Sequence, residues 1–191
     1  MKQDKPVLFM VTHCESCYNR DRLFTGRIDA ELSESGIAHA HEMAESLKDR
    51  KIDIAYRTSL IRTKQTLDPI LKYHPKCEVR VDDRLIERDY GDLSGKNKDE
   101  YAKSHPKMYP IYHRSYETPP PNGESIQQVE KRVLDFLNKL KEEMRRTNMN
   151  VLLVIHANSA RPLIRHFKHL SIEEMMGLEH TRHVIYKYWI E

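Results

Sequence analysis

Two apolar runs, each followed by a histidine, constrain the fold of this chain more than any other feature. Val7–Val11 leads through Thr12 to His13, and Val151–Ile155 leads directly to His156. The second run has no polar alternation, which is typical of a central parallel strand that is buried on both faces. In open α/β sheets, ligands bind beyond the carboxyl ends of the strands. The sequence therefore predicts two imidazoles at the ligand-binding edge of a buried sheet.

Further strand-like runs alternate with helical patterns. The predicted strands are Val7–Val11, Ile52–Tyr56, Glu78–Val81, Val151–Ile155 and Val184–Ile190, the last as an edge strand. Apolar residues at helical spacing predict one helix after Ser33, through Ile37, Ala40, Ala44 and Leu47, and others over Leu60–Tyr73, from Glu124 through Met144, and through Ala160 to Leu170. This alternation indicates a three-layer α/β sandwich, with a mostly parallel central sheet and helices on both faces.

The composition is that of an ordinary globular protein. The 191 residues suit one domain, residues 1–191, with a substantial core. Hydrophobic residues make up 39% and charged residues 32% of the chain, which excludes a disordered protein. The longest apolar run is too short to span a membrane, and the N-terminal segment is not expected to be a signal peptide.

Charge and cysteine content narrow the expected partners and compartment. The net charge is only +3, and acidic residues are interspersed among the basic ones. We therefore expect no nucleic-acid partner and no membrane partner, but a small anionic substrate. The three cysteines, without a secretory signal, favour a reducing compartment, and the expected location is cytoplasmic.

One long segment, Lys98–Asn122, is rich in proline, tyrosine and histidine and shows little periodicity. Long irregular connections in compact domains are often functional. We predict that residues 98–122 form a lid or substrate loop.

Two other ionisable side chains lie near predicted strand ends. Arg62 is at the start of the helix after the second strand, where the amides of a helix N-terminus favour anions. The alternative for Arg62 is a solvated helix arginine. Glu87 follows the third strand, and taken alone it would be a surface salt-bridge partner.

Five segments in order resemble the histidine phosphatase superfamily, and specifically its cofactor-dependent phosphoglycerate mutase branch. They are HCESCYNRDRLFTGRIDAELSESG, SLIRTKQT, RLIERDYGDLSGKNKDEYAK, HRSYETPPPNGES and VLLVIHANSARPLI. The resemblance runs from about Val7 to Ile190. Several linked motifs in the right order are far more specific than any one motif alone.

The resemblance implies an enzyme of glycolysis and gluconeogenesis that interconverts 3-phosphoglycerate and 2-phosphoglycerate. It implies that His13 is the nucleophile and carries the phosphoryl group, that Glu87 is the general acid and base, and that Arg62 and His156 hold the transferring phosphoryl group. The implied substrate-binding residues are Ser16, Asn19, Thr25, Gly26, Tyr90, Lys98, His113, Arg114 and Asn158. 2,3-Bisphosphoglycerate would prime the enzyme, with no metal and no permanently bound cofactor, and a homodimer or a monomer is equally admissible.

The chain departs from the family pattern on both sides of the nucleophile and in the substrate loop. The family motif is Arg-His-Gly, whereas this chain has Thr12-His13-Cys14. His113 replaces the first of two adjacent arginines, and Arg114 remains. Hydrogen bonds to charged groups contribute roughly 1.5–3 kcal/mol, so losing a bidentate arginine slows transfer on the order of 100-fold. We hypothesise that Arg20 or Arg22 reaches inward to compensate.

These departures leave two alternatives open. One is a histidine phosphatase that hydrolyses another small phosphoester, because Thr12 and His113 relax the charge requirements of a mutase. The other is a catalytically impaired phosphate-binding homologue that keeps the fold.

Cys14 and Cys17 form a C-x-x-C around the active-site turn. A zinc site would need further ligands that the spacing does not supply, so two small structural thiols are the favoured interpretation. Oxidation of the pair would silence His13 if a thiolate forms near the cations. The pairs His39/His41 and His180/His183 are expected on solvated faces.

Overall fold

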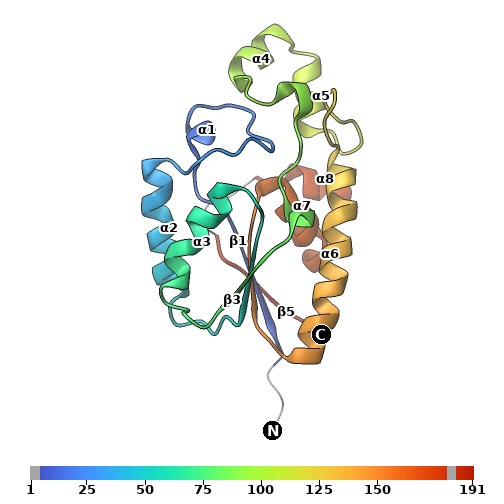
Figure 1. Cartoon of the computed structure of the whole chain (residues 1–191). Coiled ribbons are helices and arrows are strands. Elements are labelled where there is room, and N and C mark those ends of the chain that lie inside the picture. The colour runs from blue at the N-terminus through green and yellow to red at the C-terminus, as the bar shows by residue number, and fades with distance from the viewer. Residues whose placement is uncertain (1–4, 180–183) are drawn as a thin grey trace.

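The computed structural model describes residues 5–179 and 184–191, and a five-stranded sheet lies at its centre (Figure 1). The strands are β1 (Val7–Thr12), β2 (Ile54–Arg57), β3 (Glu78–Val81), β4 (Val151–Ile155) and β5 (Tyr186–Trp189), in the order β3-β2-β4-β1-β5. Strands β1 to β4 are parallel, and β5 pairs antiparallel with β1 at the edge. The predicted α/β fold with a mostly parallel sheet is confirmed, and so is the edge strand.

Two helical layers cover the sheet (Figure 1). The first contains α2 (Glu34–Leu47) and α3 (Ile61–Leu71), and the second contains α6 (Ile126–Thr147) and α7 (Ala157–Lys168). Because side chains alternate along a strand, β1 contributes to both interfaces. Phe9 and Val11 belong to the core beside α2 and α3, whereas Leu8 and Met10 belong to the core beside α6 and α7. All five residues of β4 are buried, as the absence of polar alternation predicts.

Serine caps fix where the helices of these layers begin. The side chain of Ser33 accepts a hydrogen bond from the Gly36 amide, and Ser125 forms a capping box with Gln128 at the start of α6. The α6 helix ends at Asn148, which has a left-handed φ of 55°. The expected stripe of α6 is buried.

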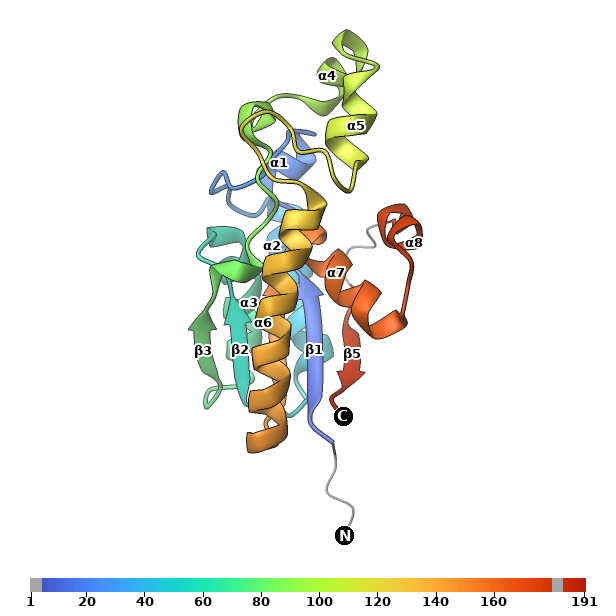
Figure 2. The ribbon, with the colours of Figure 1, turned by 90° about the vertical axis from the view of Figure 1, so that its right-hand side faces the viewer.

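A cap of short helices lies beyond the carboxyl ends of the strands (Figure 2). It contains α1 (Cys17–Arg20), α4 (Lys98–Ser104), α5 (Met108–Arg114) and two 3₁₀ turns, η1 (Asp83–Leu85) and η2 (Gly91–Leu93), with α8 (Ile172–Gly177) to one side. The prediction of an irregular segment over residues 98–122 is therefore wrong for residues 98–114, most of which form α4 and α5.

The helices α4 and α5 are stabilised by interactions that give no aliphatic helical pattern in the sequence. The side chain of Asn97 accepts hydrogen bonds from the first amides of α4. Three tyrosines of the cap, Tyr101, Tyr109 and Tyr112, pack on the buried cluster of Phe24, Tyr90 and Leu93. The apolar face is aromatic and each helix has only seven residues, so no aliphatic stripe is visible in the sequence.

Several smaller expectations are corrected. Ile37 is 47% exposed and does not belong to the buried stripe of α2, although Ala40, Ala44 and Leu47 do. The helix α8 was not predicted. His41 is exposed and His39 is half-buried, while His180 and His183 lie outside the described residues. In the described part of the chain, no helix is long and apolar enough to cross a membrane.

Candidate active site

The carboxyl ends of two neighbouring strands bring His13 and His156 together. Thr12 at the end of β1 lies in register with Ile155 at the end of β4. The amide of His13 continues this pairing and donates to the Ile155 carbonyl at 2.8 Å. The two imidazole rings consequently lie edge to face, with centroids 5.1 Å apart. This is the juxtaposition that the two apolar runs predict.

The hydrogen bond of His13 determines its neutral tautomer. Its Nδ1 lies 2.7 Å from the Cys14 carbonyl oxygen, which can only accept, so Nδ1 carries the proton. The lone pair of the neutral ring is then on Nε2. The Cys14 amide donates to Thr66 Oγ1 at 3.0 Å and holds this turn in place. A half-buried neutral imidazole in this orientation can act as a nucleophile near pH 7.

His156 is fully buried, and its environment favours the neutral ring. Burial lowers its pKa well below the ordinary value, and the nearby charges of Arg62 and His13 lower it further. Its Nε2 lies 2.9 Å from Thr58 Oγ1. Its Nδ1 is buried and has no hydrogen-bond partner among the described residues. Thr58 follows β2, so a third strand end contributes to the site.

Glu87 is buried beside the two histidines. Its Oε1 accepts hydrogen bonds from the amides of Arg88, at 2.8 Å, and Asn158, at 3.3 Å. A carboxylate oxygen of Glu87 lies within 4.8 Å of ring nitrogens of both His13 and His156. The alternative of a surface salt bridge is therefore wrong. A carboxyl group fixed here can donate or accept a proton for a group bound at His13.

Arg62 is fully buried at the start of α3, so the alternative of a solvated helix arginine is also wrong. Its Nη1 and Nη2 donate to the carbonyls of Ile28 and Gly26, each at 2.8 Å. Its Nε has no hydrogen-bond partner in the part of the chain that the structure describes. The same holds for Thr25 Oγ1, in the loop that receives the guanidinium.

These buried polar atoms without partners indicate a ligand. Native proteins satisfy most buried polar atoms, and each exception calls for an explanation such as a bound ion. Here Arg62 Nε and His156 Nδ1 belong to residues that interact electrostatically with each other. A guanidinium and a hydrogen-bonding imidazole are donors that match the oxygens of a phosphoryl group. We call His13, Arg62, Glu87 and His156 the inner site.

The inner site also contains a set of atoms that a metal ion can use. His13, Glu87 and His156 each offer one ligand atom, and these atoms lie within 4.8 Å of one another. The buried guanidinium of Arg62, which lowers the pKa of His156, opposes a divalent cation by its charge. The arrangement therefore fits an anion better than a cation.

A cavity of about 610 Å³ leads from His13 to the cap. Six of the predicted substrate-binding residues line it: Asn19, Tyr90, Lys98, His113, Arg114 and Asn158. Ser16, Thr25 and Gly26 are buried and are not among its lining residues. Ser16 instead caps α1, where its Oγ accepts from the Asn19 amide. Gly26 has a positive φ of 51° and supplies the carbonyl that binds Arg62.

The part of the cavity next to the cap is bordered by cationic side chains. Arg22, Lys98 and Arg114 line it together with His113, and we call these four residues the outer rim. Burial, together with the nearby charges of Arg114 and Lys98, lowers the pKa of His113 to about 4. His113 is therefore neutral at pH 7, so it does not replace the positive charge of an arginine.

Sequence reasoning missed several polar residues of this site, among them Arg161 and Thr58. Arg161 lines the cavity from α7, and its Nη1 donates to the Met175 carbonyl of α8 at 2.7 Å. Its only signal in the sequence was its place on the helix that follows the His156 strand end. Thr58 was missed although it follows a predicted strand, which is the same signal that identified the histidines.

The surroundings of Cys14 disfavour the thiolate that oxidation near His13 would need. Burial raises the pKa of its thiol to about 11, and the side chain packs in the core beside α2, so it is not a reactive thiolate. The positive backbone φ that a glycine would permit is not found at this position either. Replacement of the family glycine is accommodated without left-handed backbone.

Comparisons with known proteins match almost the whole chain. The family model of the histidine phosphatase superfamily (branch 1) matches residues 8–190. A 2,3-bisphosphoglycerate-dependent phosphoglycerate mutase of Brucella melitensis biotype 2 is 39% identical over 91% of this chain and 86% of its own. A phosphoglycerate mutase of Schizosaccharomyces pombe is 37% identical over 91% of this chain and 84% of its own. The solved structure of a mycobacterial glucosyl-3-phosphoglycerate phosphatase with inorganic phosphate has a TM-score of 0.78 at 26% identity, over 91% of this chain and 84% of its own.

Proposed function

The chain belongs to the histidine phosphatase superfamily (branch 1), which indicates an enzyme, and we propose that it is a phosphoglycerate mutase that works through a phosphohistidine at His13. The observation that carries the proposal is the inner site, in which a nucleophilic imidazole, a buried carboxyl group and two buried donors converge. The 37–39% identity to proteins named phosphoglycerate mutases supports the choice of substrate.

In the proposed reaction, a hydroxyl of the bound phosphoglycerate attacks the phosphohistidine of the primed enzyme and gives its proton to Glu87. The N–P bond breaks as the new ester P–O bond forms, and the product is bound 2,3-bisphosphoglycerate. In the second half, Nε2 of His13 attacks the other phosphorus of this intermediate. The N–P bond forms as that ester P–O bond breaks, the leaving oxygen takes the proton back from Glu87, and His13 is again phosphorylated, as at the start.

Positioning and charge neutralisation would supply most of the rate enhancement, because the phosphoryl group is multiply anionic during transfer. Arg62 Nε and His156 Nδ1 are the buried atoms proposed to hold its oxygens. The Nδ1 hydrogen bond to the Cys14 carbonyl would stabilise the positive charge that develops on His13. 2,3-Bisphosphoglycerate is the proposed primer, since it delivers the first phosphoryl group to His13.

A mutase must also hold a second anionic group while the intermediate reorients. Lys98 and Arg114 line the cavity that leads to His13, which supports their role in binding the carboxylate or the distal phosphate. Tyr90 and Asn158 line the same cavity and hydrogen-bond to each other at 3.4 Å.

A second candidate function is hydrolysis of a small phosphoester. It is favoured by two uncharged positions, Thr12 beside the nucleophile and the neutral His113 on the outer rim. A site with fewer cations binds a bisphosphate intermediate more weakly. Water can then attack the phosphohistidine more often. A mycobacterial phosphatase has a similar structure, with a TM-score of 0.78.

One assay separates these functions. The protein is incubated with 2,3-bisphosphoglycerate labelled on phosphorus, acid-labile phosphate on His13 is measured, and 3-phosphoglycerate is then added. For a mutase we expect label to appear in 2-phosphoglycerate faster than inorganic phosphate is released. Release of inorganic phosphate alone would support the phosphatase, and a chain that takes up no label would be an impaired binding homologue.

Thr12→Arg is the companion variant. Thr12 is buried at the end of β1, directly before the nucleophile. An added guanidinium there is expected to raise the transfer rate on the order of 10-fold to 100-fold, by the energy of charge-assisted hydrogen bonds. Its thermal unfolding is measured in parallel, because the larger side chain enters a packed position.

A further inference from the structure

Arg22 combines three features that the proposed reaction does not yet use. It lines the cavity, it belongs to the outer rim, and its backbone has a left-handed φ of 57°. Few residues other than glycine adopt this conformation, and asparagine and aspartate are the most frequent of them. Its side chain binds Asp99 through two short hydrogen bonds, of 2.6 and 2.7 Å.

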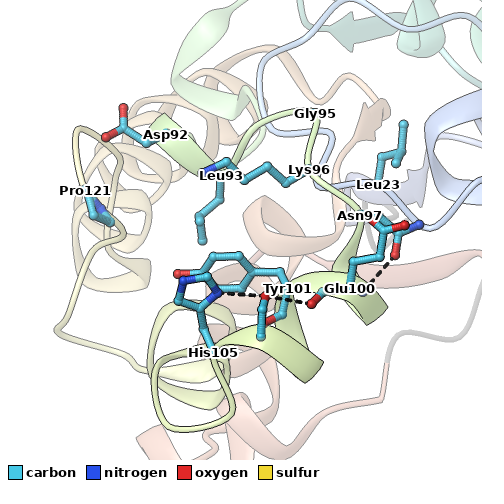
Figure 3. Close-up of a pocket in the computed structure, with 11 residues that line it drawn as sticks. Leu23, Asp92, Leu93, Gly95, Lys96, Asn97, Glu100, Tyr101, His105 and Pro121 are labelled. Carbon is cyan, nitrogen blue, oxygen red and sulfur yellow. Dashed lines mark hydrogen bonds between the residues drawn. The ribbon is translucent and has the colours of Figure 1, made fainter.

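The backbone around Arg22 fixes its position relative to α4. The Arg22 carbonyl accepts the Lys98 amide at 2.9 Å, and the Arg22 amide donates to the Asn19 carbonyl at 3.2 Å. Leu23 and Asn97 are bridged as in an antiparallel ladder. Figure 3 shows Leu23 and Asn97 at a second cavity, and Arg22 is not among the residues that line that cavity. Arg22 and Lys98 are thus held together at the main cavity.

Asp99 occupies a different position from its partner. It is not among the residues that line the cavity, whereas Arg22 is. The side chains of Arg22 and Asp99 are 62% and 49% exposed. Ion pairs of this exposure are weak because water screens them and both side chains lose rotamer freedom. An anion inside the cavity can therefore compete with Asp99 for the guanidinium.

We propose that Arg22 is a specificity-determining residue that binds the second anionic group of the substrate, and that Asp99 holds the guanidinium when this group is absent. The ligand class is a phosphate ester with a carboxylate or a second phosphate. The inference deepens the proposed function, because it names the group that the outer rim selects. It also assigns the compensating role to Arg22 and places it away from the phosphoryl group.

Arg20 provides the matched control. It lies on the same turn and forms the same kind of exposed bidentate pair, with the adjacent Asp21 at 2.8 and 3.2 Å. It does not line the cavity. If loss of surface charge alone weakened anion binding, Arg20→Met would have the same effect as Arg22→Met.

The test measures equilibrium binding by calorimetry for two probes, 3-phosphoglycerate and inorganic phosphate. Under the proposal, inorganic phosphate binds at the inner site alone, whereas 3-phosphoglycerate also presents a second anionic group to the outer rim. We expect Arg22→Met to raise the Kd for 3-phosphoglycerate about 5-fold to 10-fold and to leave the Kd for phosphate unchanged. Asp99→Asn frees the guanidinium and should lower the Kd for 3-phosphoglycerate about 2-fold to 5-fold.

The outcomes separate this inference from the proposed function. Arg20→Met and Asp21→Asn should leave both Kd values unchanged. Equal effects of Arg22→Met on the two probes, or a weaker affinity for 3-phosphoglycerate in Asp99→Asn, would overturn the role of Arg22. Failure to label His13 with 2,3-bisphosphoglycerate would overturn the proposed function, and the binding ratios stay measurable because they need no turnover.

Discussion

The residues of the inner site are held by buried hydrogen bonds from several parts of the chain, whereas the residues of the outer rim lie on the cap. Backbone amides hold the carboxylate of Glu87, and carbonyls of another loop hold the guanidinium of Arg62. Lys98 and Arg114 are at the ends of two seven-residue helices, α4 and α5. These helices rest on a small aromatic cluster that is separate from the two main cores.

This difference predicts which substitutions affect phosphoryl transfer and which affect substrate specificity. A substitution in the inner site leaves a buried polar partner unsatisfied, and such groups are costly. A substitution on the outer rim leaves the hydrogen-bond partners of the replaced side chain free to bind water, which costs little. We therefore expect inner-site variants to reduce transfer itself, and outer-rim variants to change affinity for the second anion with much smaller effects.

The largest expected effect tests the inner site. His13→Ala removes the nucleophile, and we expect transfer to fall by at least about 10⁴-fold, as for covalent catalysts that lose the nucleophile. Acid-labile label from 2,3-bisphosphoglycerate should disappear completely. Binding of inorganic phosphate, measured by calorimetry, serves as the control for an intact pocket. Residual labelling in this variant would place the phosphoryl group on another residue.

Glu87→Gln is expected to have the next largest effect. The amide keeps the shape of the side chain but cannot donate or accept the proton, so transfer from phosphoglycerate should fall about 10²-fold to 10⁴-fold. Labelling of His13 by p-nitrophenyl phosphate should fall much less, because nitrophenolate leaves without a proton. An equal loss with both donors would show that Glu87 acts by its charge and not as an acid.

On the outer rim, His113→Arg is expected to restore a positive charge. His113 is neutral above about pH 4, and an arginine there should lower the Kd for 3-phosphoglycerate about 5-fold. The Kd for inorganic phosphate should stay the same, because that ligand does not reach the rim. His113→Gln is the matched control, because glutamine carries no charge at any pH. A tighter binding of both ligands would contradict the division into inner site and outer rim.

The two histidines of the inner site were predictable because they follow strong local signals. The apolar runs before His13 and His156 identify strand ends, and parallel strands present those ends at one edge of the sheet. Arg62 and Glu87 needed the resemblance of whole segments to a known family. Neither signal could reveal that both side chains are fully or nearly fully buried, because burial depends on the loops that fold over them.

The cap was predicted less well, for a physical reason. Its helices are held by tyrosines and by the Asn97 cap, which do not produce an aliphatic helical period. Arg161 and the pairing of Arg22 with Asp99 depend on contacts between distant segments. The tautomer of His13 depends on the direction of one carbonyl group.

The smallest expected effect tests whether His113, on the outer rim, has the lowered pKa of a buried histidine. Burial lowers the pKa of His113 from about 6.5 to about 4, so between these values the unfolded chain binds more protons than the folded chain. Above pH 6.5, His113 should therefore have no effect on how the free energy of unfolding depends on pH. Below pH 6.5, the free energy of unfolding should decrease as the pH falls toward 4. A single group contributes at most about 1.4 kcal/mol per pH unit to this decline, and a half-buried group contributes less.

In His113→Gln, the decline measured by urea unfolding should be shallower but still present, because the pKa of His156 is lowered too. Identical slopes in the two proteins would mean that His113 titrates normally, and the outer rim would then carry a fourth positive charge at mildly acidic pH.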